Sequence, residues 1–323
     1  MANYKPHVSR RNFIKKSGSA ALAIPLLPLA DPFSLTSNVI NDGPQVHLFS
    51  KHLQFLRYDE MAKAAAEIGF DGLDLTVRPK GHVLPEHVER DLLKAMEAMN
   101  KYGLKSKMMT TNVLNTSIDL DRQVLETASK LGITHYRTGW LSYPENRSIQ
   151  ESQKIYRELF KKLESANKEL ALVGCYQNHA GNHVGAPIWD MPPLLPSPQS
   201  THLGCQYDIR HAVVEGGMSW ELDLRYIAPY IRSIVIKDFK WGMENGQWKP
   251  INTPLGEGMI DFGRYFSLLK KYKINVPISL HLEYDLGGAE HGATEITMDK
   301  KVIFAKMKKD LTFLKETWDK AEY

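Results

Sequence analysis

Gly204-Cys205-Gln206-Tyr207-Asp208-Ile209-Arg210-His211 is the stretch of sequence that decides the fold. It is an extended, partly apolar run that ends in a carboxylate, and an imidazole follows three residues later. Because side chains alternate along a strand, Gln206 and Asp208 share one face, and His211 falls in the first turn after the strand. In a barrel of parallel strands, that turn lies at the rim where functional groups gather. The stretch therefore predicts a strand that ends at such a rim.

Extended runs alternate with helical patterns from residue 45 to the end of the chain, and glycines separate many helices from the next strand. Alternating βα units predict a parallel sheet, and eight of them predict a closed (β/α)8 barrel of the TIM type. The expected strands are 45–49, 72–76, 105–110, 135–138, 171–177, 203–208, 233–237 and 277–282. The expected helices are 58–68, 85–102, 121–131, 148–167, 220–230, 262–272 and 299–318. The alternative is a doubly wound open sheet, which usually has a Gly-rich phosphate turn after its first strand, and Phe49-Ser50-Lys51-His52 is not one.

The chain divides into an export signal at 1–30, a linker at 31–44 rich in Pro, Asn and Asp, and a single barrel domain at 45–323. Paired arginines, Arg10 and Arg11, precede an apolar run that is too short and too interrupted by proline to span a bilayer. This pattern is typical of a twin-arginine signal, with an N-terminal amphipathic helix as the structural alternative. It predicts a periplasmic protein that uses the twin-arginine export machinery and has no stable membrane anchor.

The formal charge of +4 comes from the first 30 residues, which hold five basic residues and no acidic one. The rest of the chain has 36 basic and 37 acidic residues, so it is close to neutral. A near-neutral domain gives no electrostatic case for binding nucleic acid. The chain has two cysteines, Cys175 and Cys205, and we expect both to be buried free thiols because they lie on opposite faces of their strands.

Polar side chains gather where the predicted strands end. Burying so many ionisable groups is costly unless they pair, bind a metal or meet a polar ligand. We therefore predict a functional site, with a network of salt bridges as the structural alternative. For Lys237 in particular, that alternative is a salt bridge to Asp208. The candidates are Arg78, His82, Arg137, Gln177, His179, Asp208, His211, Lys237, His281 and Glu283.

A divalent metal is one use for these groups. His179, Asp208 and Glu283 would supply one nitrogen and two carboxylates. Such a set suits Mn²⁺ or Zn²⁺ with open positions for substrate oxygens. No two of these residues stand at a local spacing that is diagnostic of a metal site.

Several segments together resemble the xylose isomerase-like TIM barrel family, described broadly as sugar phosphate isomerases and epimerases. The resemblance covers about residues 45–315 and has its motifs in a fixed order along the chain. The matching segments are Gly69-Phe70-Asp71-Gly72-Leu73-Asp74, Gln177-Asn178-His179, Asp208-Ile209-Arg210-His211, Leu255-Gly256-Glu257-Gly258-Met259-Ile260-Asp261-Phe262 and Glu283.

The resemblance implies a small-molecule carbohydrate substrate. In the ketose 3-epimerase branch, two glutamates, an aspartate and a histidine hold a divalent metal. Asp208 and Glu283 carry over as metal ligands, and His211 carries over as a substrate contact. Val235 stands where that branch has its strand-seven histidine, and the strand-five glutamate is also missing. The resemblance therefore implies a rebuilt ligand set, in which His179 or His281 is a substitute.

Three functions remain open for a barrel of this kind. The first is an isomerase or epimerase that abstracts a proton next to a carbonyl and forms an enediolate. The second is β-elimination on 3-keto-glycosides, with Glu283 as base, Lys237 or a metal at the oxyanion, and His211 or His179 as acid. The third is a sugar-binding barrel without catalysis. A DNA-repair endonuclease, which occurs in this superfamily, is opposed by the near-neutral charge and the export signal.

In the catalytic hypotheses, Glu283, Lys237 and His211 carry the chemistry. Five further residues are predicted to bind substrate: Arg78, His82, Arg137, Gln177 and His281. A homo-oligomer is left open.

Overall fold

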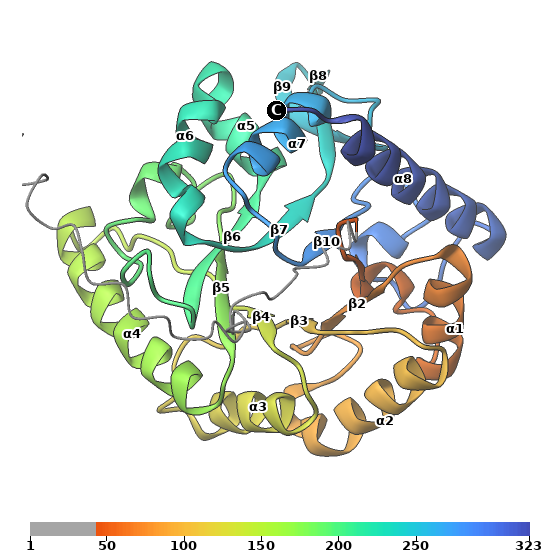
Figure 1. Ribbon diagram of the computed structural model, residues 1–323, viewed down its shortest axis with the longest axis horizontal. Coiled ribbons are helices and arrows are strands. Elements are labelled where there is room, and N and C mark those ends of the chain that lie inside the picture. The colour runs from red at the N-terminus through yellow and green to blue at the C-terminus, as the bar shows by residue number, and fades with distance from the viewer. Residues whose placement is uncertain (1–42) are drawn as a thin grey trace, which may run out of the picture. The chain divides into compact units, whose positions relative to one another are not determined.

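Eight parallel strands close into a barrel, and helices surround it (Figure 1). The structure, a computed structural model, describes residues 43–323, so the predicted export signal lies outside the described residues. The order around the barrel is β1-β10-β7-β6-β5-β4-β3-β2, and every neighbouring pair is parallel. The strands are β1 (Val46–Phe49), β2 (Gly72–Thr76), β3 (Met108–Thr110), β4 (His135–Arg137), β5 (Val173–Gln177), β6 (Leu203–Asp208), β7 (Ile231–Ile236) and β10 (Ile278–Leu280). The closed barrel confirms the predicted fold class.

An α-helix follows every barrel strand except β5, after which, as predicted, a long loop replaces a regular helix. Glycine and capping residues set several of their ends: Gly69 ends α1 in the left-handed conformation, and Ser148 with Glu151 forms a capping box at the start of α4. The helices are α1 (Tyr58–Ile68), α2 (Val88–Lys101), α3 (Asp119–Lys130), α4 (Ile149–Glu169), α5 (Ile209–Gly216), α6 (Trp220–Ile227), α7 (Phe262–Lys271) and α8 (Lys300–Lys320). From residue 43 onward, no helix is both long and apolar enough to cross a bilayer.

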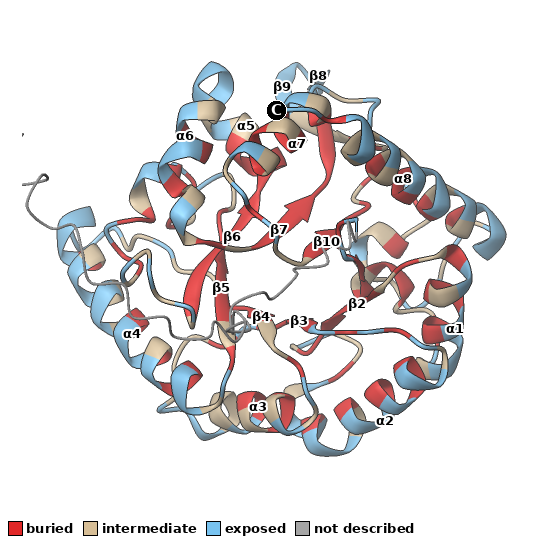
Figure 2. Cartoon of the chain, in the orientation of Figure 1, coloured by how far each residue is buried: buried red, intermediate tan, exposed pale blue. Residues whose placement is uncertain are grey.

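The core fills the barrel and the layer between strands and helices, as the burial colours in Figure 2 show. Leu48, Leu73 and Leu75 are completely buried. Both faces of these strands are covered, so their sequences are apolar with few interruptions. The outer faces of the helices are exposed, which is the pattern of a barrel wrapped by amphipathic helices.

Two elements differ from the sequence expectation. Helix α5 begins directly after β6, where no helix was expected. The segment after Lys237 is a β-hairpin of β8 (Asp238–Glu244) and β9 (Gln247–Thr253), which was expected only as an irregular excursion. Its turn is Asn245-Gly246, with φ of 51° and 76°, the geometry of a type I′ hairpin turn. Cys175 and Cys205 are free and buried, as expected.

Candidate functional site

A small polar cavity of about 70 Å³ opens at the carboxyl ends of the strands. Side chains from β1, β4 and β5 line it, together with residues that directly follow β2, β7 and β10. The lining residues are Phe49, Lys51, Arg78, Arg137, Trp140, Gln177, His179, Lys237, His281 and Glu283. Seven of them are among the predicted site residues, so the barrel does bring most of the candidates to one place.

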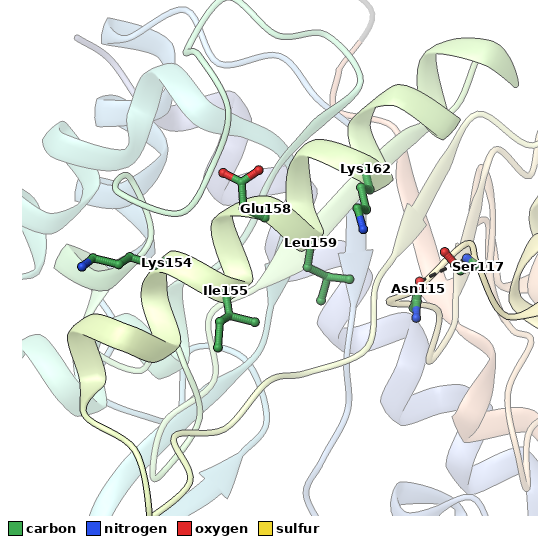
Figure 3. Close-up of a pocket in the computed structure, with 7 residues that line it drawn as sticks. All are labelled: Asn115, Ser117, Lys154, Ile155, Glu158, Leu159 and Lys162. Atoms are coloured by element: carbon green, nitrogen blue, oxygen red, sulfur yellow. Dashed lines mark hydrogen bonds between the residues drawn. The ribbon is translucent and has the colours of Figure 1, made fainter.

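A larger groove of about 510 Å³ lies elsewhere, on the outer surface beside α4. Figure 3 shows Lys154, Glu158 and Lys162 along the helix, with Asn115 and Ser117 on the facing loop. Its ionisable side chains are on the solvent face of a helix, where pairing and desolvation are weak. The smaller cavity in the barrel mouth is therefore the candidate functional site.

Lys237 lies at the centre of the polar network in this cavity. Its Nζ is 3.1 Å from Asp208 Oδ2, 3.5 Å from Glu283 Oε2 and 2.9 Å from His211 Nε2. The side chain comes from the residue after β7, whereas the two carboxylates belong to β6 and to the residues after β10. The expected ion pair with Asp208 is present, but the ammonium also reaches Glu283, which lines the cavity. Lys237 is thus shared between a buried anion and an accessible one.

The Asp208 carboxylate accepts hydrogen bonds from two elements, helix α5 and strand β5. Its Oδ1 accepts the backbone N–H of His211 and caps α5, and its Oδ2 accepts from Gln177 Nε2 at 2.8 Å. The residue is completely buried, so desolvation raises the pKa of its carboxyl, although Lys237 acts in the opposite direction. The carboxylate therefore depends on Lys237, Gln177 and the helix amide for its stability.

Glu283 is the only carboxylate among the residues that line the cavity, and a quarter of its side chain is exposed. Its Oε1 is 3.1 Å from Lys51 Nζ. Burial alone would raise the pKa of Glu283, but Lys237, His281 and Lys51 outweigh it and hold that pKa well below its usual range. The group is therefore ionised at neutral pH and can accept a proton.

Three imidazoles in and behind the cavity, those of His179, His211 and His281, are kept neutral because burial lowers their pKa values. The pKa falls to about 4 for His179 and about 3 for His281, and lies well below its usual range for His211. His179 Nδ1 faces the carbonyl of Ala180 at 2.9 Å, so this nitrogen carries the ring proton and leaves Nε2 as an acceptor. His281 stacks on Phe49, with ring centroids 4.1 Å apart.

His211 does not line the cavity. It lies behind it, with its Nε2 against Lys237 and its Nδ1 3.1 Å from Arg210 Nη1. Its ring centroid is 4.0 Å from that of His179. His211 therefore contacts Lys237 and is not brought to the cavity lining with the other predicted catalytic residues.

Among the predicted substrate contacts, Arg78, Arg137, Gln177 and His281 line the cavity and His82 does not. Both ring nitrogens of His82 face groups of the protein, Ser50 Oγ and the Leu53 carbonyl, each at 3.1 Å. Burial lowers the pKa of His82 to about 4, so the ring is neutral. The structure thus gives His82 a structural position rather than the predicted contact with substrate.

Three lining residues escaped the sequence interpretation: Phe49, Lys51 and Trp140. Phe49 ends β1, and Lys51 sits in the short 3₁₀ helix Ser50–Leu53 that follows it. The signal for both was their position at the carboxyl end of the first strand, Phe49 as its last residue and Lys51 just beyond it. Trp140 follows β4, and its ring packs against Arg137 with the guanidinium carbon 4.1 Å from the ring centroid.

The segment that resembles the family's Gly-Glu-Gly motif has a structural function in this chain. Asp238 is buried, and its Oδ2 accepts the backbone N–H groups of Gly256 and Gly258, each at 3.0 Å. A Cβ at Gly258 would collide with the Asp238 carboxylate. Asp238 therefore fixes this loop from the face opposite Lys237, as strand alternation predicts.

The predicted metal ligands do not form a metal centre as arranged. Between residues 43 and 323, no group of three or more His, Cys, Asp or Glu side chains could hold an ion. The Lys237 ammonium stands between Asp208 and Glu283, and Asp208 Oδ2 already accepts from Gln177 and Lys237. A divalent ion at these carboxylates would have to displace that ammonium, so the residues present do not fit one.

Taken together, the cavity offers an ionised carboxylate, two ammonium groups beside it, two neutral imidazoles and two guanidinium groups. This set can take a proton from a carbon acid and stabilise the oxygen on which negative charge develops. The aromatic rings of Phe49 and Trp140 complete the walls.

Comparison with solved structures finds the same fold in several proteins. D-psicose 3-epimerase from Clostridium cellulolyticum H10 superposes with a TM-score of 0.59 at 12% identity, over 85% of this chain and 99% of the epimerase. The 3-keto-D-glucoside 4-epimerase of E. coli gives 0.60 at 13% identity, over 83% and 99%. A probable 3-DHS dehydratase from Bacillus anthracis gives 0.58 at 15% identity, over 83% and 98%. At these identities the likeness concerns the fold.

No curated protein sequence matches the chain significantly. The family model for the xylose isomerase-like TIM barrel matches residues 62–300, which is well over half of the chain. Together with the closed eight-stranded barrel, this match shows that the chain belongs to the xylose isomerase-like TIM barrel family.

Proposed function

We propose that this protein is a sugar isomerase or epimerase that abstracts a proton next to a carbonyl of a sugar or keto-sugar. The observation that carries the proposal is the pairing of Glu283 with Lys237 in the cavity wall, with their charged atoms 3.5 Å apart. Several structural neighbours are sugar epimerases, which supports the same class of chemistry.

In the proposed reaction, Glu283 takes the proton from the carbon next to the carbonyl. The electron pair of the broken C–H bond moves to the carbonyl oxygen, and the Lys237 ammonium donates a hydrogen bond to the enediolate oxygen. Delivery of a proton to the opposite face of the same carbon, by a second donor such as water, gives the epimer. Delivery of the proton from Glu283 to the former carbonyl carbon, with transfer of the neighbouring hydroxyl proton to the enediolate oxygen, gives the isomer. Because the pKa of Glu283 is low, it is a weak base, and stabilisation of the enediolate has to supply much of the rate.

A second candidate is β-elimination on a 3-keto-glycoside. The specific observation in its favour is that Glu283 is the only carboxylate that lines the cavity, and elimination needs one base rather than two. A probable dehydratase among the structural neighbours supports it as well. Both candidates share the first step, so they differ only in what leaves after proton abstraction.

We also propose that the protein acts in the periplasm after twin-arginine export. The support for this is the Arg10-Arg11 pair and the short apolar run that follows it.

The test of the proposed function is exchange of carbon-bound hydrogen with solvent. The purified protein is incubated in D₂O with ketohexoses and with 3-keto-glucosides, and NMR records deuterium at the carbon next to the carbonyl. We expect incorporation by the wild type and a loss of at least about a hundredfold in Glu283→Gln, which keeps the size of the side chain but removes the base. An epimer, an isomer or an enone among the products identifies the reaction.

The matched control is Glu257→Gln, because Glu257 is exposed and pairs with Lys309 on the outer surface. This variant should exchange deuterium at the wild-type rate. Folded wild-type protein that exchanges no deuterium with any of these substrates would contradict the proposal. Sugar binding without exchange would instead favour a sugar-binding barrel without catalysis.

A further inference from the structure

The charges of the cavity wall are strongly unbalanced. Four cationic side chains line it, and they face one carboxylate, Glu283. The lysines are compensated: Lys51 pairs with Glu283, and Lys237 pairs with Glu283 and Asp208. The remaining cations are Arg78 and Arg137. No carboxylate of the described residues lies within 4.0 Å of either guanidinium.

Arg137 is held in place without an anion. The residue is 3% exposed, its Nη2 donates to the Thr111 carbonyl at 3.0 Å, and its guanidinium carbon lies 4.1 Å from the centroid of the Trp140 ring. Its Nε is buried and has no hydrogen-bond partner. Burial lowers the pKa of Arg137 to about 9, so the group still carries its charge at neutral pH. A buried cation with an open donor is costly unless a ligand completes it.

Arg78 lies just after β2 and lines the same cavity. Its guanidinium carbon lies 5.6 Å from the centroid of the Phe49 ring, and its Nε is also buried without a partner. Asp74, a buried carboxylate of β2, accepts from Thr110 at 3.0 Å and from Ser279 at 2.7 Å rather than from an arginine. Two guanidinium groups that have no carboxylate partner among the described residues therefore line one cavity.

We propose that the substrate of this enzyme carries an oxyanion, a carboxylate or a phosphate, which Arg78 and Arg137 bind while the carbonyl of the same sugar meets Lys237 and Glu283. A guanidinium matches the geometry of both oxyanions, and an aromatic face behind it holds the planar group in place. The inference rests on the proposed function only in placing a sugar in this cavity. The substrate class is then an acidic sugar rather than a neutral one.

Binding rather than turnover tests the inference. Calorimetry on the purified full chain measures the affinity for D-glucuronate, D-glucose 6-phosphate and D-glucose, which separates a carboxylate, a phosphate and a neutral sugar. We expect at least one acidic sugar to bind about tenfold or more tightly than D-glucose, since hydrogen bonds to charged groups are strong. Higher salt should weaken only the acidic ligands.

Arg78→Gln, at a half-buried position, should lose about tenfold in affinity for the acidic sugar and little for D-glucose. Arg137→Lys keeps the positive charge but loses the planar guanidinium that donates two parallel hydrogen bonds. We expect it, too, to lose affinity for the acidic sugar and little for D-glucose. The control is Arg225→Gln, because Arg225 is exposed on α6 and does not line the cavity. If Arg137→Lys fails to fold, Arg78→Gln alone decides.

Equal affinity of the wild type for all three sugars, unchanged in Arg78→Gln, would overturn the inference. The binding and exchange experiments decide the inference and the proposed function independently. Arginine-dependent binding of an acidic sugar without any deuterium exchange would leave the inference standing and defeat the proposed function. Deuterium exchange into neutral ketoses, with no preference for acidic sugars, would do the reverse.

Discussion

Lys237 occupies the place that a metal would take between Asp208 and Glu283, the two carboxylates that the sequence assigns to a metal site. An ammonium and a divalent ion compete for the same oxygens, so the lysine should exclude the ion as long as it remains. The exclusion of a divalent ion by Lys237 can be tested without knowing the substrate.

Lys237→Ala should turn the site into a metal site. The wild type should bind neither Mn²⁺ nor Zn²⁺ stoichiometrically, and EDTA should leave its deuterium exchange unchanged. The variant leaves Asp208 buried without its partner, at a cost of about 3–5 kcal/mol in stability. Added Mn²⁺ should restore part of this loss, about 2.7 kcal/mol at a hundredfold excess over its dissociation constant.

Thermal unfolding with and without Mn²⁺ measures this effect, and Lys51→Ala is the control because Lys51 pairs only with Glu283. A wild-type protein that is purified with one tightly bound ion per chain, and that loses exchange activity in EDTA, would contradict this prediction.

Residue by residue, strand alternation predicts the cavity well where the strand is long and regular. Gln177 and Asp208, the last residues of β5 and β6, reach one network, and Asp238 lies on the opposite face from Lys237, as expected. Glu283 joins the same network although it lies beyond the end of β10. His82 lies beyond the strand end, where alternation no longer applies, and hydrogen bonds to Ser50 and Leu53 decide its direction.

At the scale of elements, strand β6 and helix α1 have the bounds that the sequence predicts. Helix α5 was missed because no loop separates it from β6: Asp208 ends the strand and caps the helix. The β8–β9 hairpin was missed although Asn245-Gly246 is a strong hairpin signal. Its strands carry few alternating apolar residues, because the hairpin stands on the surface instead of packing in the core.

Helix α8 carries a carboxyl whose titration should control stability. Asp310 is buried and accepts from Tyr284 Oη at 3.0 Å, and burial raises its pKa to about 7. The folded state then binds more protons than the unfolded state, where the pKa is about 3.9. The free energy of unfolding should therefore fall as the pH rises from about 4 to about 7, by roughly 1.4 kcal/mol for each unit of difference between the two pKa values. Above about pH 7 it should stay level.

Asp310→Asn keeps an acceptor for Tyr284 and removes the charge. Denaturant unfolding between pH 4 and pH 8 should show this variant to be more stable than the wild type at pH 8, with a weaker dependence on pH. Asp319→Asn, at an exposed position of the same helix, should leave the curve unchanged. Equal slopes for the wild type and Asp310→Asn would contradict the prediction.

For the whole molecule, the barrel and the proposed export signal have separate consequences. Because twin-arginine transport requires the arginine pair, replacing Arg10 and Arg11 with lysine should leave the precursor in the cytoplasm. Immunoblots of periplasmic and cytoplasmic fractions measure this, with Lys16→Gln as the control outside the pair. Unchanged export of the double variant would show that another route carries the protein.

Closure of the barrel also determines which strand edges of this protein remain unpaired and could pair with another chain. Each barrel strand pairs on both sides, whereas β8 and β9 pair only with each other in the part of the chain that the structure describes. Trp241, Met243 and Trp248 are 42%, 59% and 64% exposed on this hairpin. Open strand edges beside exposed apolar side chains are where a foreign strand can add. Aggregation of the folded protein should therefore begin at the hairpin, while the barrel itself offers no edge to extend.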